Sequence, residues 1–270
     1  THEPIASPPE LAAQYPNADN PNQALYYANV TNVDRAVARL LKALDDLKEA
    51  DNTFVLFTSD NGPALLNGYP EGRGARCYGT PGPLRGMKLH IYDGGIRVPG
   101  IIRWPGHSQA GKVIDEPVCS LDLLPTFCEI AGIETPKDRA LDGASFLPVL
   151  ANQPVKRSTP LFWIYCMAAS KPKVAMRDGD WNLVAHWDVE ETFTGVTPAM
   201  VKAFKKAKLI NFELYNLKDD IGEKKDLAGE QPQRVKAMAS TLRGLFAQVQ
   251  KEGPVWPAPK KNATSRPAHE

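Results

Sequence analysis

Several features are scarce in this sequence, and each scarcity excludes a class of protein. The 270 residues include only four cysteines, none in a Cys-x-x-Cys spacing. That is too few for a disulfide scaffold and the wrong pattern for structural zinc. No apolar run approaches the roughly 18 residues that a membrane span needs. A net charge of +1 provides no basic excess for binding nucleic acid. We therefore expect neither a membrane span nor a nucleic-acid partner.

What remains is the composition of an ordinary globular protein. Hydrophobic residues make up 43% and charged residues 23% of the sequence, enough for one large domain or for one domain and a smaller one. The opening "THEPIASPPE" is polar and rich in proline, unlike a secretory signal peptide. We interpret the cysteines as free thiols, and one or two disulfides are the alternative if the protein is exported. They are Cys77, Cys119, Cys128 and Cys166.

The first half of the sequence predicts helices and strands in α/β order. Apolar residues recur every three or four positions over 30–47, which predicts an amphipathic helix. They are Val30, Val33, Val37, Leu40, Leu44 and Leu47. The apolar stretch 54–58 predicts a strand covered on both faces, as in a parallel sheet. The segment "GGIRVPGIIRWPG" predicts a strand that Pro99 interrupts. Ser120 is the expected N-cap of a helix that Gly132 ends.

The second half predicts a small antiparallel sheet. The stretches "KVAMR" and "WNLVAHW" flank Asp178-Gly179, a favoured hairpin dipeptide, and "FELYNL" is a third strand. The last helix has an apolar stripe, which consists of Val235, Met238, Leu242, Leu245, Phe246 and Val249. We expect an α/β part over 1–155, an α+β subdomain over 156–252 and a tail over 253–270.

A carboxylate and a carboxamide stand together where the first predicted strand ends. In "TFVLFTSDNG", Asp60 and Asn61 come directly after the apolar run, and ligands of open α/β sheets lie beyond the carboxyl ends of strands. Their oxygens are hard ligands that suit Ca²⁺ or Mg²⁺. The alternative is turn chemistry, with Asp60 capping a turn and Asn61 tolerating an unusual φ.

Three further residues could hold an anion. Lys88 precedes a glycine pair in "LRGMKLHIYDGG", and an ammonium offers three donors to an anionic oxygen. His90 is two positions away and would share the face of Lys88 in an extended segment. His2 could act as a proton donor. Each of these is, taken alone, also compatible with an ordinary surface side chain.

Together these motifs resemble a known family. The segments "THEPIAS", "ADNTFVLFTSDNG", "LRGMKLHIYDGGIRVPGIIRWPG", "DRALDG" and "ELYNLKDDIGEKKDLA" are similar to the type I sulfatases of the alkaline-phosphatase-like superfamily. The similarity is greatest to the N-acetylgalactosamine-6-sulfatase and arylsulfatase A branch. It extends from His2 to about residue 250. It implies the C-terminal part of an alkaline-phosphatase-like fold, a mixed or parallel sheet sandwiched by helices, followed by a small antiparallel sheet with a packed helix.

The resemblance also implies roles for individual residues. Asp60 and Asn61 match calcium ligands of the family, Lys88 matches a lysine that contacts the substrate sulfate, and His2 matches a histidine at the sulfate or the leaving oxygen. His90 could line the same pocket. Asp93 stands where the family usually has glutamate. The implied catalytic residues are therefore His2 and Lys88, with His90 as a further substrate contact and Asp60 and Asn61 at the metal.

One family element is missing from the 270 residues. No cysteine or serine lies in a Cys/Ser-x-Pro-x-Arg element, whose cysteine the family converts to the nucleophile formylglycine. The paired aspartates that supply the first two calcium ligands are also absent. The chain therefore resembles the C-terminal part of a sulfatase and is expected to be inactive alone.

The implied function is hydrolysis of a sulfate ester, on a sulfated carbohydrate or an aryl sulfate, with Ca²⁺ and formylglycine. The implied location is extracytoplasmic: periplasmic, secreted or lysosomal. Two alternatives stay open. One is a phosphodiesterase or phosphonate hydrolase of the same superfamily, and the other is a non-catalytic protein that binds anions or glycans.

Overall fold

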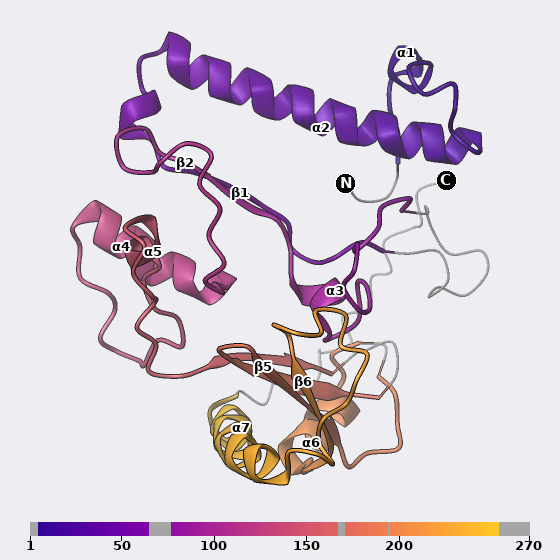
Figure 1. Cartoon of the computed structure of the whole chain (residues 1–270), viewed down its shortest axis with the longest axis vertical. Helices are drawn as coiled ribbons and strands as arrows, with labels where there is room; N and C mark the ends of the chain where they lie inside the picture. The colour runs from indigo at the N-terminus through magenta and orange to yellow at the C-terminus, as the bar shows by residue number, and fades with distance from the viewer. Residues whose placement is uncertain (1–4, 65–76, 167–170, 194, 254–270) are drawn as a thin grey trace, which may run out of the picture.

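The chain forms two antiparallel sheets with helices around them. The computed structural model describes residues 5–64, 77–166, 171–193 and 195–253. In these residues a two-stranded sheet has the order β1-β2, and a four-stranded sheet has the order β3-β4-β5-β6. Figure 1 shows α2 standing apart from the four-stranded sheet, with β1 and β2 between them.

The first predicted helix is present, but much of its apolar stripe is exposed to solvent. The short helix α1 (Pro9–Ala12) packs on α2 (Pro21–Asp46). Asn20 caps the start of α2, because its side chain accepts the Gln23 N–H at 3.1 Å. A Pro after an Asn cap favours a helix start at this point. On the stripe, however, Leu40 is 56% and Leu47 is 70% exposed.

Strand β1 (Val55–Thr58) pairs antiparallel with β2 (Gly100–Arg103) after the 3₁₀ turn η1 (Ala50–Asn52). The expected cover on both faces is not what the described residues form. Phe54 packs against aromatic rings on one side, those of Trp104, Phe127 and Phe146. On the other face Phe57 is 40% and Ile101 is 61% exposed. In the described part of the chain, β1 therefore has one packed face and one open face.

Part of the strand expected in "GGIRVPG" is helical instead. Helix α3 (Asp93–Ile96) is a single turn, closed by the Arg97 N–H donating to the Asp93 carbonyl at 2.7 Å. Two glycines in this turn meet neighbouring backbone so closely that a Cβ would lie 2.5 Å or less from a carbonyl oxygen. Close backbone packing around the two glycines therefore accounts for the turn, and the strand begins only at Gly100.

The cap of the next helical segment is Cys119, one position before the expected cap. A 3₁₀ turn η3 (Ser120–Asp122) leads into α4 (Leu123–Ala131), and the Cys119 N–H donates to the Asp122 carboxylate at 2.7 Å. Ser120 is therefore inside the turn and is not the cap. Gly132 has φ +66°, which confirms it as the helix end. The buried Asp122 also pairs with Arg157 at 2.6 and 2.7 Å, and α5 (Leu147–Leu150) follows.

The four-stranded sheet confirms the predicted hairpin and third strand. Its strands are β3 (Leu161–Tyr165), β4 (Lys173–Asp178), β5 (Trp181–Trp187) and β6 (Leu209–Asn216), all antiparallel. The β4-β5 turn holds Gly179 at φ +57°, a conformation that glycine adopts without strain. Strand β3 and helix α6 (Pro198–Lys206) were not predicted.

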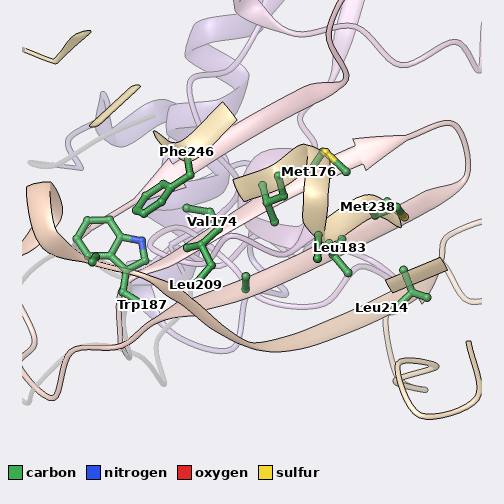
Figure 2. Packing of buried hydrophobic residues seen from close by; sticks show 12 residues of the cluster. Val174, Met176, Leu183, Trp187, Leu209, Leu214, Met238 and Phe246 are labelled. Atoms are coloured by element: carbon green, nitrogen blue, oxygen red, sulfur yellow. The ribbon is translucent and has the colours of Figure 1, made fainter. Parts of the chain in front are cut away.

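The last helix, α7 (Pro232–Glu252), covers one face of this sheet. Its buried Met238, Leu242 and Phe246 meet apolar side chains of β4, β5 and β6, as Figure 2 shows around Trp187, Leu183 and Val174. The predicted apolar stripe of this helix is thus confirmed except at Val249, which is exposed. Among the described residues no helix has the length and hydropathy of a membrane span, and the four cysteines are free thiols.

Candidate functional site

The predicted metal ligands lie at the end of β1. Asp60 is exposed and Asn61 is half-buried. The Asn61 Nδ2 donates to the Gly62 carbonyl at 2.8 Å, and the Ser59 Oγ donates to the Asn61 carbonyl at 3.0 Å. The unusual φ of the alternative is not found, because Asn61 is not among the described residues with positive φ. The turn uses the amide nitrogen of Asn61 and leaves its side-chain oxygen as a hard donor beside the Asp60 carboxylate.

A close backbone contact joins this turn to the segment that carries Lys88. The Gly62 N–H donates to the Gly95 carbonyl at 3.0 Å, and the Lys88 N–H donates to the Pro63 carbonyl at 2.9 Å. A Cβ on Gly62 would lie 1.9 Å from the Gly94 oxygen. Only glycine permits this approach, so the structure brings the backbone of the Asp-Asn turn beside that of Lys88.

The other two predicted residues have different outcomes. His2 lies outside the described residues. His90 is half-buried, and its backbone N–H donates to the Met87 carbonyl at 2.9 Å. Burial lowers the pKa of His90, and the charges of Lys173 and Arg85 lower it further. A neutral imidazole at this position could donate one hydrogen bond through one ring nitrogen and accept one through the other.

The residue between Lys88 and His90 has an unusual backbone. Leu89 has φ +74°, in the left-handed region that a branched L-residue rarely occupies. Such a conformation persists only where the surroundings hold it in place, and it is found often at functional sites. Lys88 and His90, the two residues proposed to face the anion, therefore flank a residue with a strained backbone conformation.

A polar cluster that was not predicted lies next to this segment. The Glu213 carboxylate accepts hydrogen bonds from the Tyr92 hydroxyl at 2.8 Å, the Tyr215 hydroxyl at 2.6 Å and the His186 Nε2 at 2.7 Å. Burial alone would raise the pKa of Glu213, but these hydrogen bonds outweigh it and lower the pKa to about 2. The carboxylate is therefore ionised at neutral pH.

Arg85 lies over the same cluster. Its guanidinium is 3.8 Å from the centre of the Tyr92 ring and donates to the Tyr215 hydroxyl at 2.8 Å and the Glu223 carbonyl at 3.0 Å. We call the set of Arg85, Tyr92, His186, Glu213 and Tyr215 the Glu213 cluster. The spacing of Glu213 and Tyr215 places both on one face of a strand, which was the available sequence signal.

A pair of buried acids lies beside the cluster. The Glu223 carboxylate accepts the Asp93 N–H at 2.9 Å and the Asn182 Nδ2 at 2.7 Å. Burial raises the pKa of Glu223 to about 7, and the charge of Asp93 contributes to the rise. Burial also raises the pKa of Asp93, against the lowering effect of Arg177 and Arg97. No local pattern in the sequence distinguishes Glu223 from a surface residue.

Two family models cover this arrangement. The model described as sulfatase matches residues 1–133. The model described as the C-terminal region of N-sulphoglucosamine sulphohydrolase matches residues 87–252.

The chain belongs to the sulfatase family.

Characterised sulfatases match over part of their length. The steryl-sulfatase of Rattus norvegicus is 37% identical over 159 residues, which are 58% of this chain and 27% of that protein. The N-acetylgalactosamine-6-sulfatase of Homo sapiens is 38% identical over 151 residues, 56% of this chain and 26% of that protein. The chain thus spans about a quarter of the curated relatives it matches.

Several solved structures share the fold over most of this chain. Ps i-CgsB has a TM-score of 0.68 at 26% identity, covering 93% of this chain and 53% of that one. A protein solved with its substrate D-glucosamine-2-N,6-O-disulfate has a TM-score of 0.59 at 25% identity, covering 90% and 46%. The phosphonate monoester hydrolase of Agrobacterium radiobacter, with a TM-score of 0.55 at 24% identity and coverage of 84% and 41%, shows the fold alone. This sulfatase chain is thus mixed α/β with the alkaline-phosphatase-like fold.

Proposed function

We propose that this chain forms part of a hydrolase of sulfate esters that acts on a sulfated carbohydrate or an aryl sulfate. The observation that supports it most directly is the contact of the Asp-Asn turn with the lysine segment, through the Lys88–Pro63 and Gly62–Gly95 hydrogen bonds. The contact supports a sulfatase site because the chain belongs to the sulfatase family and both segments match the sulfatase motifs. Two of the similar solved proteins hold a sulfated glucosamine and a neocarrahexaose, which favours a carbohydrate substrate.

The donor set at the end of β1 fits part of a calcium shell. Asp60 offers an exposed carboxylate, and Asn61 has an amide oxygen beside it. Ca²⁺ takes six to eight hard oxygens, so these two would supply a minority of them. Within the described ranges no three His, Cys, Asp or Glu side chains gather as a metal site. When bound, the cation would stabilise negative charge on sulfate oxygens as a Lewis acid.

The other roles belong to side chains of the chain itself. The Lys88 ammonium would hold a non-bridging sulfate oxygen, and its attraction would strengthen as charge develops on that oxygen. His2 would donate a proton to the leaving oxygen, and His90 would line the pocket. We propose that a formylglycine nucleophile comes from outside these 270 residues, because none of them forms the Cys-x-Pro-x-Arg element. An extracytoplasmic location is part of the same proposal.

The activity can be tested on the complete gene product. Its rates with 4-nitrophenyl sulfate and 4-nitrophenyl phosphate should favour the sulfate ester. A preference for the phosphate would favour a phosphodiesterase or phosphonate hydrolase. Absence of turnover together with retained binding of sulfated oligosaccharide would favour a non-catalytic glycan-binding protein. Either result would overturn the proposal.

Lys88→Met tests the proposed anion contact. Loss of one donor to developing charge should lower kcat about 10²–10³-fold. Lys137→Met is the matched control, because Lys137 is an exposed residue in a surface ion pair with Glu134. Equal activity of the two variants would show that Lys88 does not act on the sulfate.

Asp60→Asn tests the proposed metal ligand. Because Ca²⁺ affinity falls with ligand charge, the Ca²⁺ concentration that gives half-maximal activity after removal of metal with EDTA should rise. Asp51→Asn, in the exposed turn η1, is the control and should leave that concentration unchanged. If the unmodified protein and both variants needed the same Ca²⁺ concentration for half-maximal activity, Asp60 would not be a ligand of the proposed Ca²⁺ site.

A further inference from the structure

The four-stranded sheet has two faces of different chemistry. The face toward α7 is apolar and carries Leu183 and Leu214. The opposite face carries Val184 and Tyr215, which pack against Ile91 and Tyr92. In Figure 1, α3 and the chain leading to it lie on this second side, away from α7. The segment that carries Lys88, residues 85–93, is therefore seated on the sheet of the C-terminal half.

Both ends of this lysine segment are fastened by polar contacts. At its start, Arg85 stacks on Tyr92 and donates to Tyr215. At its end, the Tyr92 hydroxyl donates to Glu213 at 2.8 Å, and the Asp93 N–H donates to Glu223 at 2.9 Å. Glu213 accepts from both tyrosines. One carboxylate on β6 is thereby connected to the two ends of the segment.

The middle of the segment is held differently. The backbone of Lys88 bonds to Pro63 and that of His90 to Met87, and Leu89 between them has φ +74°. This conformation is unfavourable for a leucine, so it needs fixed ends to persist. The Glu213 cluster supplies those fixed ends: Tyr215 is 130 positions from Arg85 and Glu213 is 121 positions from Tyr92 in the sequence.

We propose that Arg85 and Glu213 are positioning residues for Lys88, which they hold in place by clamping the ends of segment 85–93 to the four-stranded sheet. The inference rests on the proposed role of Lys88 and deepens it. Neither side chain touches the sulfate in this scheme. The C-terminal sheet thus contributes to the reaction by fixing the direction of the lysine.

A double-mutant cycle in the complete gene product tests the proposal. Misplacement of a reacting group by about 1 Å can lower the rate about 10²-fold, so Arg85→Met should reduce kcat on 4-nitrophenyl sulfate by up to that factor. In a Lys88→Met background the same change should have less than about a twofold effect, because the group being positioned is already gone. Glu213→Gln, which keeps the size of the side chain, should behave in the same way.

The matched control is Arg243→Met. Arg243 places its guanidinium 4.7 Å from the centre of the Phe212 ring, so this variant also removes an arginine–aromatic contact beside β6. It should leave kcat unchanged. If Arg85→Met and Glu213→Gln lowered kcat by equal factors in both backgrounds, or not at all, the positioning role would be wrong.

Hydrogen exchange provides a readout that does not need activity. In Arg85→Met and Glu213→Gln, amides of the lysine segment such as those of His90 and Gly94 should exchange faster, while those of β4 and β5 stay protected. Unchanged exchange over 85–94 would overturn the clamp. If the unmodified protein hydrolysed no sulfate ester, the proposed function would fail, and the exchange result would still decide whether the clamp exists.

Discussion

At the scale of single residues, Glu223 shows how burial governs a carboxyl group. It is buried beside Asp93 and is held by an amide N–H and the Asn182 side chain. Its pKa rises from 4.5 to about 7. The folded state therefore keeps a proton that the unfolded state has already released above pH 4.5. Stability from this group is present at low pH and is lost as the pH rises toward 7.

Glu223→Gln should reduce this loss. A shift of this size corresponds to a stability difference on the order of 3 kcal/mol, so the variant should gain stability relative to the unmodified protein between pH 5 and pH 8. Gln can still accept the Asp93 N–H. Its amide N–H can donate to Asn182 once the Asn182 amide turns over, so that Oδ1, which has no hydrogen-bond partner, replaces Nδ2 at this contact. The measurement is the urea midpoint at several pH values, with the exposed Glu129→Gln as control. A decline with pH as steep as that of the unmodified protein would contradict the prediction.

At the scale of elements, a glycine contact joins β1 to α3. The turn after β1 approaches α3 so closely that the Gly62 α-carbon faces the Gly94 carbonyl. The approach brings the proposed metal ligands beside the lysine segment. A side chain at this position would push the two elements apart, because the obstructing atoms belong to the backbone.

Gly62→Ala should therefore affect both stability and activity. The new Cβ would lie 1.9 Å from the Gly94 oxygen, and overpacking of this kind typically costs about 1–3 kcal/mol. The urea midpoint and kcat of the complete gene product should both fall. Gly100→Ala in β2 is the control, because its Cβ would meet no atom within 4 Å. Equal urea midpoints for the two variants would show that the close backbone approach does not limit the stability of the protein.

The sequence predicted the elements with strong periodicity. Helices α2, α4 and α7 and the strands around Asp178-Gly179 show a repeat or a turn dipeptide, so the local signal was sufficient. Helix α3 was mistaken for a strand because its two glycines are fixed by neighbouring backbone rather than by propensity. Strand β3 has neither a cap nor a repeat. Helix α6 does have a start signal, because Thr197 caps it and Pro198 follows, and the sequence interpretation missed it.

The candidate site was predictable only in part. Asp60, Asn61 and Lys88 follow recognisable motifs, and their backbones are neighbours in the fold. The Glu213 cluster joins Arg85 to residues about 130 positions away. Such a cluster depends on the register of the four-stranded sheet and on the side of it that receives segment 85–93. Neither can be derived from a single strand pattern.

At the scale of the whole molecule, the described residues form separate cores. The largest consists only of residues between Val174 and Phe246, inside the proposed subdomain 156–252. A smaller core lies around Phe146, Val149 and Val155. A third cluster joins the two parts of the chain: Ile91 and Tyr92, from residues 1–155, pack on the four-stranded sheet. The boundary at 155/156 stays a prediction, which this separation of the cores favours.

Residues 156–253 produced alone should fold cooperatively, because the sheet and α7 bury their shared core without the first part. Loss of Ile91 and Tyr92 from the opposite face should lower the stability without abolishing the transition. Urea unfolding followed by tryptophan fluorescence measures this, since Trp187 is buried in the core. As control, Leu242→Ala in the same polypeptide should reduce the free energy of unfolding by about 2–5 kcal/mol. A gradual change without a midpoint, or a midpoint insensitive to Leu242→Ala, would mean that the C-terminal sheet requires the first part of the chain to fold.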